Sequence, residues 1–428
     1  MEIYILPALK DTNPYKLPKD FEASMVDGSE ILRVPYALAV HGIEEEKAVL
    51  EVLRAHKTIM GDKTRKFEAG IAATFGKKYG VMVNSGSSAN LLALELLKLP
   101  KDAEVITPVL TFSTTLSPIL QKGLKPVFVD VEPDTYVINI EHLKAKITDK
   151  TKVLMIPSLI GNVPNMEALR KLALDYSLAL IEDSCDTLGS MYDGLPTGIY
   201  SHISTTSFYG SHIITAGGGG GMLCVNHPAW DQRARVLRGW GRSSAVDESE
   251  DIRKRFGVEV DGIPYDSKFI FDEVGYNFLP TEMSAAFGLE QLKKIKTFSE
   301  IRGRNVTSLY TFFSNYKQFF TLPRQLPEVT TNWLAFPLTI HPEAPFSRTL
   351  LTTYLEENNI QTRPIFTGNV LRQPAFRHLA PPKFADQFPV ADHIMRNAFL
   401  VGCNHGLTER HITYMKQVFT KFLDKFTS

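Results

Sequence analysis

Short apolar runs alternate with amphipathic segments through most of the chain. Apolar runs typical of buried strands occur at residues 79–84, 103–110, 125–132, 152–159, 178–185, 204–209 and 220–226. Segments with apolar residues at helical spacing precede or separate them, at residues 42–57, 64–76, 85–99, 114–123 and 165–177. Strands that alternate with helices predict an α/β fold in which a mostly parallel sheet is covered on both faces.

A long helical pattern at residues 281–313 leads from this unit into a smaller one. The smaller unit carries strand patterns at residues 332–340 and 360–366 and helical patterns at residues 347–359 and 407–426. We therefore predict a large domain at residues 41–300 and a small α/β domain at residues 301–428. Residues 1–40 hold scattered prolines and weak periodicity, which indicates an extended arm over the surface or onto a partner subunit.

Composition and charge narrow the class of protein. The 428 residues are 44% hydrophobic, enough to bury a large core, and Lys+Arg and Asp+Glu both total 47. Without a basic excess, nucleic acid is not an expected partner. Three dispersed cysteines, the lack of a signal peptide and the lack of an apolar stretch of about 18 residues favour a soluble protein of the reducing cytoplasm, away from membranes.

The segment "NSGSSAN", residues 84–90, lies between an expected strand and an expected helix. At that place in an open parallel sheet, backbone N–H groups of the helix start can hold an anion. Gly86 permits a close turn, while Ser87 and Ser88 add hydroxyl groups that suit a phosphate. Serines in this position also serve simply as helix caps, so the motif alone leaves both readings open.

The segment "IEDSCD", residues 181–186, ends another expected strand and places Asp183 and Asp186 three residues apart. A carboxylate there could pair with the protonated ring nitrogen of a cofactor, as in pyridoxal phosphate chemistry. Acidic residues at strand ends also act as helix caps or lie in solvated turns. The pair therefore needs support from other motifs.

That support comes from the order of motifs along the chain: "NSGSSANLLALELL", "ITPVLTFSTT", "KPVFVDVEPDTYVIN", "IEDSCDTLGSMYDG", "SFYGSH", "GGGG" and "GYNFLPTEMSAAFGLEQL". From about residue 45 onward this set resembles the pyridoxal-phosphate-dependent sugar aminotransferases of fold type I. The resemblance implies a seven-stranded, mostly parallel sheet between helices, a smaller C-terminal α/β domain, and a homodimer with shared active sites. It further implies cofactor contacts by Gly86, Ser87, Phe112, Asp183, Ser207 and, across the dimer, Asn277.

His212 stands where most members of that family carry the lysine that binds the cofactor covalently. An imidazole has no primary amine, but it transfers protons near neutral pH. Noncovalent pyridoxal or pyridoxamine phosphate is therefore expected. The replacement resembles the nucleotide-sugar 3-dehydratases, which implies removal of the C3 hydroxyl from a nucleotide-linked 4-keto-6-deoxyhexose with glutamate as amino donor. Asp186 is then expected to position His212 or the cofactor, and Arg363 and Asn369 to contact the substrate.

Two features depart from the relatives. Some of these dehydratases carry a [2Fe–2S] cluster, which usually takes four thiolates, but residues 240–257 contain no cysteine where cluster-bearing relatives place several. No cluster is therefore expected, although segments such as "RKRFG" and "RQPAF" look more like the cluster-bearing branch. Gly218 replaces the usual glutamate of a "GEGG" motif, which removes a carboxylate and adds backbone freedom.

Two other functions stay open from the sequence. A scaffold that lost its lysine could bind a nucleotide sugar or a partner protein without catalysis, although it would have no need to keep the cofactor residues. A conventional aminotransferase could use another lysine, such as Lys268. The pair Cys403 and His405 lacks the further ligands of a metal site, so no metal is expected.

Overall fold

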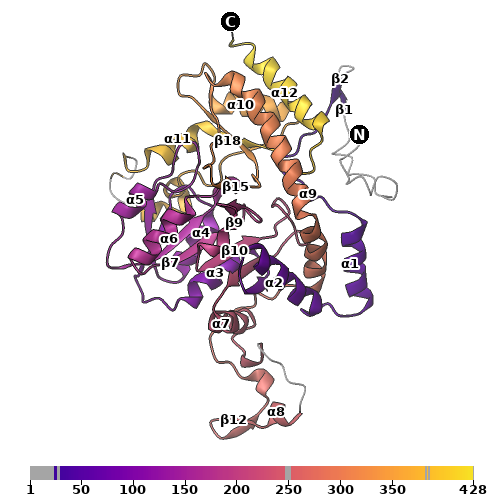
Figure 1. Ribbon diagram of the computed structural model, residues 1–428, viewed down its shortest axis with the longest axis vertical. Coiled ribbons are helices and arrows are strands. Elements are labelled where there is room, and N and C mark those ends of the chain that lie inside the picture. The colour runs from indigo at the N-terminus through magenta and orange to yellow at the C-terminus, as the bar shows by residue number, and fades with distance from the viewer. Residues whose placement is uncertain (1–23, 27–28, 246–251, 381–382, 384–385, 428) are drawn as a thin grey trace.

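A seven-stranded sheet forms the centre of the large domain (Figure 1) in the computed structural model, which describes residues 24–26, 29–245, 252–380, 383 and 386–427. Its order is β3 (Tyr79–Val83), β11 (Gly221–Val225), β10 (Ile203–Ser207), β7 (Ala179–Asp183), β6 (Thr151–Pro157), β4 (Glu104–Pro108) and β5 (Lys125–Val129). Neighbouring strands run parallel except β11, which is antiparallel to both β3 and β10. Each predicted strand of this domain is present, so the predicted fold is confirmed.

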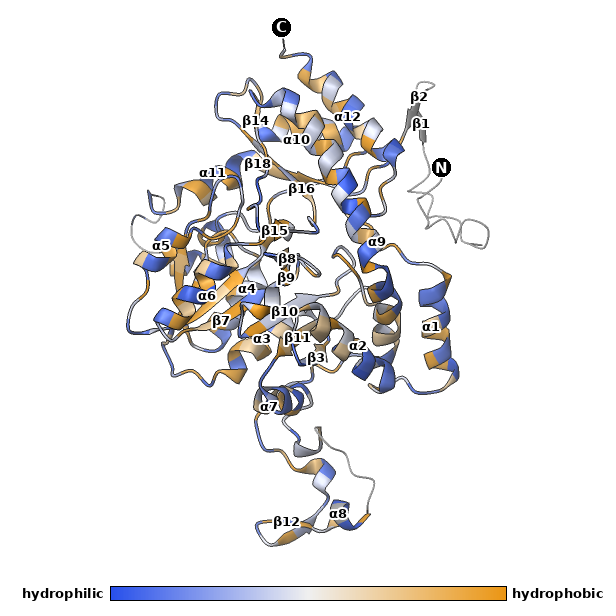
Figure 2. Cartoon of the chain, in the orientation of Figure 1, coloured by the Kyte–Doolittle hydropathy of each residue, from blue (hydrophilic) through white to orange (hydrophobic). Residues whose placement is uncertain are grey.

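The strands are buried on both faces, and alternate side chains enter different cores, as the period of two requires. In β6, Val153 belongs to one core and Leu154 to another. The first face is covered by α3 (Gly86–Leu96), α4 (Ser113–Gln121) and α7 (Pro228–Arg238). The second face is covered by α2 (Asp62–Thr74), α5 (Ile140–Ala145), α6 (Met166–Asp175) and α9 (Glu282–Phe313). Figure 2 shows hydrophobic residues gathered on the strands and on the inner helix faces.

The small domain is built on a four-stranded antiparallel sheet, in the order β14 (Phe320–Thr321), β16 (Phe336–Ile340), β18 (Ala398–Val401) and β17 (Thr362–Arg363). Its α-helices are α10 (Arg348–Glu357), α11 (Pro389–Asn397) and α12 (Glu409–Leu423). The strand predicted at 360–366 shrinks to the two residues of β17, and β18 and α11 have no counterpart in the sequence pattern. A strand of four residues is too short for its period to stand out from the flanking loops.

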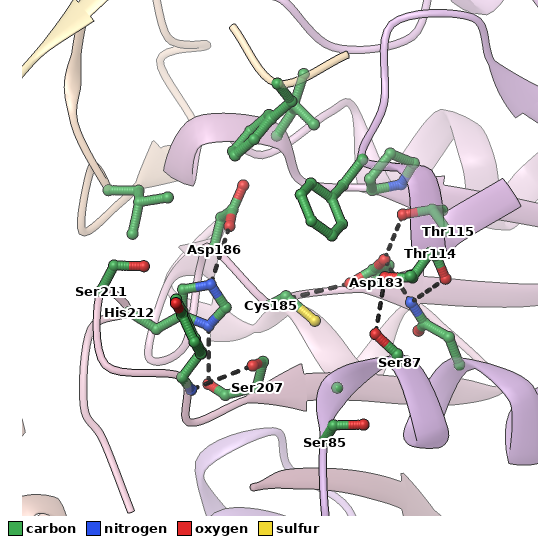
Figure 3. Close-up of a pocket in the computed structure, with 18 of the residues that line it drawn as sticks. Ser85, Ser87, Thr114, Thr115, Asp183, Cys185, Asp186, Ser207, Ser211 and His212 are labelled. Carbon is green, nitrogen blue, oxygen red and sulfur yellow. Dashed lines mark hydrogen bonds and ion pairs between the residues drawn. The ribbon is translucent and has the colours of Figure 1, made fainter. Parts of the chain in front are cut away.

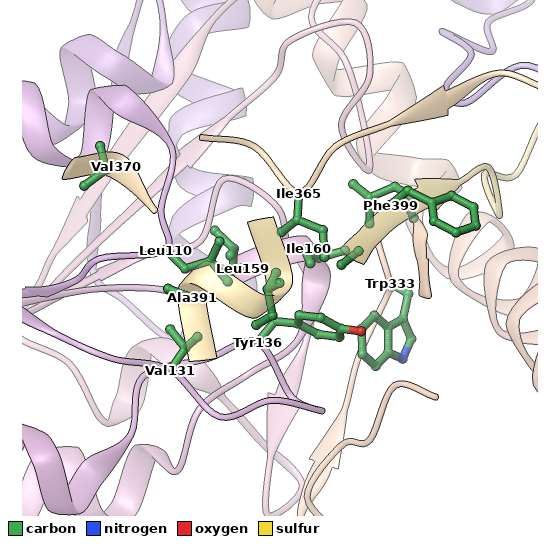
Figure 4. Close-up of a cluster of buried hydrophobic side chains, with 14 of the residues drawn as sticks. Leu110, Val131, Tyr136, Leu159, Ile160, Trp333, Ile365, Val370, Ala391 and Phe399 are labelled. Atoms are coloured by element: carbon green, nitrogen blue, oxygen red, sulfur yellow. The ribbon is translucent and has the colours of Figure 1, made fainter. Parts of the chain in front are cut away.

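The two domains share one continuous hydrophobic core. Figure 4 shows Leu110, Tyr136 and Ile160 of the large domain among side chains of the small domain, including Trp333 and Ile365. Helix α9 spans the predicted boundary near residue 300 without a break. The domains are therefore joined by packing as well as by the chain.

Shorter elements complete the fold. They are β1 (Ser24–Val26), β2 (Ser29–Ile31), α1 (Ile43–Arg54), η3 (Leu159–Gly161), β8 (Met191–Tyr192), β9 (Leu195–Pro196), η4 (Thr197–Ile199), η7 (Ser314–Tyr316), β15 (Val329–Thr330), η8 (Val370–Arg372) and η9 (Pro374–Leu379). Much of the predicted N-terminal arm lies outside the described residues. The described end of this segment does not lie on the surface as predicted. Val34 is fully buried and pairs with Ile360 of the small domain.

A projecting arm, residues 240–245 and 252–276, extends from the end of α7 away from the body (Figure 1). It carries η5 (Ser243–Ala245), α8 (Ile252–Phe256), β12 (Val258–Val260), β13 (Ile263–Tyr265) and η6 (Ser267–Phe269). An ion pair between Arg233 and Glu273, 2.6 Å long, ties its base to α7. The arm exposes many large apolar side chains, with Val274 96% exposed. Such a surface is typical of a protein interface.

Glu282, in the first turn of α9, caps the start of α2. Its carboxylate accepts hydrogen bonds from the backbone N–H groups of Gly61, Lys63 and Thr64 at 2.6–3.1 Å, and from the Thr64 hydroxyl at 2.7 Å. The carboxylate is almost fully buried. It therefore satisfies otherwise unpaired donors of one helix while fixing that helix against another.

We expect Glu282→Ala to lower the free energy of unfolding by about 2 kcal/mol, because several buried N–H groups lose their acceptor. The shift in the urea unfolding transition, followed by circular dichroism, measures this change. Glu290→Ala is the matched control, since Glu290 lies on the same helix and pairs with the exposed Lys293. Equal shifts in the two variants would contradict the assigned cap.

Candidate active site

A cavity of about 650 Å³ opens at the carboxyl ends of β7 and β10, between the two domains. It brings together most of the site residues predicted from the sequence: Gly86, Ser87, Phe112, Asp183, Asp186, Ser207, His212 and Arg363. Figure 3 shows Asp183 and Ser87 on one side of it and Asp186, Ser211 and His212 on the other. Asn277 and Asn369 are not among the residues that line it.

The first turn of α3 forms one wall of the cavity. Ser85 is the N-cap, and its hydroxyl accepts a hydrogen bond from the Ser88 N–H at 3.1 Å. A Cβ atom on Gly86 would lie 2.6 Å from the Cβ of Ser207, so only glycine allows β10 and α3 to meet this closely. The Ser87 hydroxyl also faces the cavity and donates to Thr114 Oγ1 at 2.9 Å. This wall offers hydroxyl groups and a helix N-terminus, the chemistry that a phosphate requires.

Asp183, the last residue of β7, is a buried carboxylate held from three sides. Its Oδ2 accepts hydrogen bonds at 2.8 Å from Asn90 Nδ2 and from the Thr115 hydroxyl, and its Oδ1 accepts from the Cys185 N–H at 3.2 Å. Asn90 is itself fixed, because its Oδ1 accepts from the Thr205 hydroxyl at 2.6 Å. The contacts orient the carboxylate, and Oδ1 keeps acceptor capacity for a ligand donor in the cavity.

Phe112 presents an apolar ring to the same space. It is the N-cap residue of α4, half exposed, and its ring makes an edge contact with Phe366 at a centroid distance of 5.8 Å. Together, the ring, the Asp183 carboxylate and the α3 wall fit a phosphorylated pyridine: a stacking surface, an acceptor for the ring nitrogen and a cradle for the phosphate. None of the described residues that line the cavity is a lysine.

His212 lies in the loop after β10. Its Nδ1 is 3.3 Å from the Ser207 carbonyl oxygen. A carbonyl can only accept, so the imidazole proton resides on Nδ1 and the Nε2 lone pair is free. Nε2 is 3.9 Å from Asp186 Oδ1, too far for a hydrogen bond, while Asp186 Oδ2 accepts from the Ile160 N–H at 2.9 Å. The basic nitrogen therefore faces the cavity beside a carboxyl group.

Burial shifts both groups toward their neutral forms. It lowers the pKa of His212 to about 4 and raises the pKa of Asp186 to about 7, with the charge of Asp183 adding to the second shift. Near pH 6 the contact is therefore between a neutral imidazole and a protonated carboxyl group, and it is not an ion pair. A neutral imidazole is the form that can accept a proton.

The remaining predicted residues lie elsewhere. Asn369 is fully buried, donating to Asp392 at 2.8 Å and accepting from the Leu371 N–H at 3.1 Å, so its amide offers nothing to the cavity. The expected substrate contact by Asn369 is thus not supported, because the residue caps the turn η8. Asn277 is exposed at the base of the projecting arm, and Lys268 lies in η6 on that arm.

Sequence reasoning missed the residues that hold the site in shape. Asn90 lies in the motif "NSGSSAN" and Thr115 in the motif "ITPVLTFSTT", but the motifs point to other residues. The feature that marks both is a polar side chain on an otherwise apolar helix face. Tyr36 also lines the cavity. Nothing in its local sequence marks it, because its place depends on contacts with the small domain.

Gly218 adopts φ +102°, a backbone conformation that residues other than glycine rarely adopt. The residue is exposed, and its N–H donates to Thr215 Oγ1 at 3.1 Å. Gly221 is restricted by space instead, since a Cβ there would lie 2.3 Å from the backbone of Ser85. The loop conformation at position 218 therefore favours glycine.

The described ranges also show what the protein lacks in metal ligands and apolar helices. No group of three or more histidine, cysteine, aspartate or glutamate side chains is placed to share a metal ion. Within the same part of the chain, no helix has both the length and the apolar composition needed to cross a membrane.

Similarity to known proteins extends along most of the chain. Residues 40–420 match the model of the DegT/DnrJ/EryC1/StrS aminotransferase family. The chain belongs to this family. The family predicted from the motifs is therefore confirmed.

Several relatives of the chain are named as 3-dehydratases, and another is named as a lipopolysaccharide biosynthesis protein. The chain is 37% identical to a dTDP-4-dehydro-2,6-dideoxy-D-glucose 3-dehydratase of Saccharopolyspora spinosa, over 90% of this chain and 86% of the relative. It is 35% identical to the lipopolysaccharide biosynthesis protein RfbH of Salmonella typhimurium, over 95% of this chain and 94% of the relative. A solved GDP-4-keto-6-deoxymannose-3-dehydratase with a trapped PLP-glutamate geminal diamine superposes with a TM-score of 0.79 at 30% identity, covering 90% of this chain and 99% of that one.

The stability of Asp186→Asn relative to the wild type is expected to depend on pH. In the folded protein the pKa of Asp186 lies at about 7, above its ordinary value of 3.8. The folded state thus holds a proton that the unfolded chain has lost, and the contribution of Asp186 to stability falls as the pH rises from about 4 to about 7. Asp186→Asn does not lose stability in this way. Its free energy of unfolding relative to that of the wild type should therefore increase up to about pH 7 and be constant above it.

Urea unfolding of both proteins at several values between about pH 5 and about pH 8 measures the difference. His212 titrates in both proteins, so its opposite contribution cancels in the comparison. Asp193→Asn, at an exposed carboxylate, is the control and should show no such trend. A difference between Asp186→Asn and the wild type that does not change with pH would contradict the shifted pKa.

Proposed function

We propose that the chain is a pyridoxal/pyridoxamine-phosphate-dependent 3-dehydratase that removes the C3 hydroxyl from a nucleotide-linked 4-keto-6-deoxyhexose. One observation carries the proposal: a neutral, partly buried imidazole, His212, stands in the cavity where most of the family has a lysine. No lysine lines the cavity among the described residues. The named dehydratase relatives support the same reaction class.

The cofactor residues follow from the fit of the cavity. Ser87, Ser207 and the start of α3 would hold the phosphate, Phe112 would stack on the ring, and Asp183 would keep the ring nitrogen protonated. When bound as pyridoxamine phosphate, the cofactor supplies an amine that joins the substrate ketone and a conjugated ring that accepts electron density. Without a lysine anchor, noncovalent contacts such as these would retain the cofactor.

His212 acts as the acid and base. Its Nδ1 proton is fixed by the Ser207 carbonyl, so Nε2 is the atom that removes and returns protons. Asp186, mostly protonated below about pH 7, then sits beside Nε2 without competing for a proton as a charged carboxylate would. The contact of Asp186 with the Ile160 N–H positions it there. Arg363 offers its guanidinium to the anionic part of the substrate.

Glutamate would restore the amine form of the cofactor after each turnover. The trapped PLP-glutamate adduct in the related dehydratase supports glutamate as the donor. An iron-sulfur cluster is not part of the proposal, because the chain has three cysteines and such a cluster usually takes four thiolates. Cys224 and Cys403 are moreover buried in separate parts of the fold.

The alternatives gain less support. A conventional aminotransferase needs a lysine at the cofactor, and Lys268 lies on the projecting arm, outside the cavity of its own chain. A silent scaffold would have no reason to keep the Asp183 network and a neutral imidazole in one cavity. The dehydratase is therefore the function that uses both the Asp183 network and the neutral imidazole of His212.

We expect His212→Asn to lower C3 deoxygenation at least about a hundredfold, because the proton acceptor is lost while the shape is kept. The purified protein, pyridoxal phosphate and glutamate are incubated with CDP-, GDP- and dTDP-4-keto-6-deoxyhexoses, and mass spectrometry detects loss of the C3 oxygen. The exposed His378→Asn serves as the control and should match the wild type. Full activity of His212→Asn, or wild-type product that carries an amine in place of the C4 ketone, would refute the proposed reaction.

The second part of the proposal is a homodimer with shared sites. Asn277 would reach the cofactor phosphate of the neighbouring subunit, since it is exposed and does not line its own cavity. The exposed Phe271 and Val274 lie just before it on the projecting arm and would be covered in such a dimer.

Subunit mixing tests this arrangement. If Asn277→Ala is inactive alone, mixing it with His212→Asn should restore about a quarter of wild-type activity, because half of the random dimers are mixed and each has one intact site. Activity is measured after exchange, with each variant alone as the control. If Asn277 served its own chain, every site in the mixed dimer would lack one residue, and the mixture would stay inactive.

A further inference from the structure

Tyr36 reaches the cavity from the N-terminal part of the chain, far from the other site residues in sequence. It lines the cavity together with Arg363, Pro364 and Phe366 of the small domain. The sequence motifs assign it no role, and the proposed reaction does not yet use it. The position of Tyr36 in the cavity wall suggests that its side chain contacts part of a ligand.

The backbone around Tyr36 is held firmly by the small domain. The Tyr36 N–H donates to Gln361 Oε1 at 3.1 Å, and Asn404 Nδ2 donates to the carbonyl oxygens of Pro35 and Tyr36 at 3.1 and 3.2 Å. Gly402 makes room for this segment, since a Cβ there would lie 2.3 Å from the Pro35 carbonyl oxygen. These contacts fix the backbone of Tyr36 against the small domain.

The Tyr36 hydroxyl has no hydrogen-bond partner in the part of the chain that the structure describes. Burial raises the pKa of Tyr36, so the hydroxyl stays protonated and can both donate and accept. A polar group that is held in place and left without a protein partner at a cavity wall is available to a ligand.

Arg363, beside Tyr36, restricts which part of the ligand the Tyr36 hydroxyl can contact. Its guanidinium carbon lies 5.6 Å from the centroid of the Tyr36 ring, and within the described ranges no carboxylate pairs with it. Arginine is the natural partner of a phosphate or carboxylate, whereas a tyrosine hydroxyl suits a neutral hydroxyl or ring oxygen. Arg363 is therefore suited to an anionic part of the ligand, and the hydroxyl of the neighbouring Tyr36 is suited to an uncharged part.

The apolar surroundings favour a sugar as the uncharged part. Leu334, Pro364 and Phe366 line the same cavity as Tyr36 and present no charge. A 6-deoxyhexose has apolar C–H faces together with hydroxyl groups, so it matches apolar side chains interrupted by one fixed hydroxyl. Glutamate, which has two carboxylates, gains less from a neutral hydroxyl.

We propose that Tyr36 is a substrate-binding residue that holds the hexose of the nucleotide sugar by a hydrogen bond from its hydroxyl to a sugar oxygen. The inference rests on the proposed function and adds to it the group that recognises the sugar. It also gives the small domain a part in substrate selection, separate from the cofactor contacts of the large domain.

Tyr36→Phe removes this one hydrogen bond and keeps the ring. We expect the dissociation constant for the accepted nucleotide sugar, measured by calorimetry on the cofactor-loaded protein, to rise about tenfold, as expected for one neutral hydrogen bond. The affinity for pyridoxal phosphate and the rate at which glutamate yields 2-oxoglutarate should stay unchanged. Tyr176→Phe, at an exposed tyrosine outside the cavity, is the matched control.

Unchanged sugar affinity in Tyr36→Phe would overturn the inference and leave the proposed reaction intact. An equal loss of cofactor affinity or of the glutamate reaction would also overturn it, because Tyr36 would then serve the cofactor or the donor. A wild-type protein that converts glutamate but binds none of the three nucleotide sugars would overturn the proposed function and this inference with it. Matching circular dichroism and cofactor content confirm that each variant is folded.

Discussion

The buried carboxylate of Asp183 is the group on which the architecture of the site depends. A charge at the end of β7 is costly to bury unless it is hydrogen-bonded, and its partners come from different elements: Asn90 from α3 and Thr115 from α4, with Thr205 of β10 holding Asn90. The network can form only when the strands and both helices are packed correctly. Folding of the large domain and assembly of the cofactor site are therefore one event.

The same burial sets the chemistry of the opposite wall. In a site of low polarity both His212 and Asp186 favour their neutral forms, which leaves an imidazole lone pair and a carboxyl proton side by side. A lysine in place of His212 would bring an amine that bonds to the cofactor. In the proposed reaction, the histidine gives up that covalent anchor and keeps proton transfer, and the phosphate cradle, the Phe112 ring and Asp183 would retain the cofactor.

A strained turn links this wall to the small domain. Ile160 has φ +61°, which is rare for a β-branched residue and costs of order 1–3 kcal/mol. In this conformation its N–H donates to Asp186 while its carbonyl oxygen accepts from the Leu334 N–H at 2.8 Å. One residue thus connects the carboxyl group beside His212 with the strand that leads into β16. The shared core around Ile160 compensates for the strain.

The sequence by itself determined the seven strands of the large sheet, the helices between them and the replacement at His212, because periodicity and motifs are properties of neighbouring residues. Only the tertiary structure decided which side chains meet. It turned Asn369 into a buried cap, showed Asn90 and Thr115 as the support of Asp183, and brought Tyr36 to Gln361 across 325 positions of sequence. Contacts of that range depend on how the elements pack, and no local pattern records them.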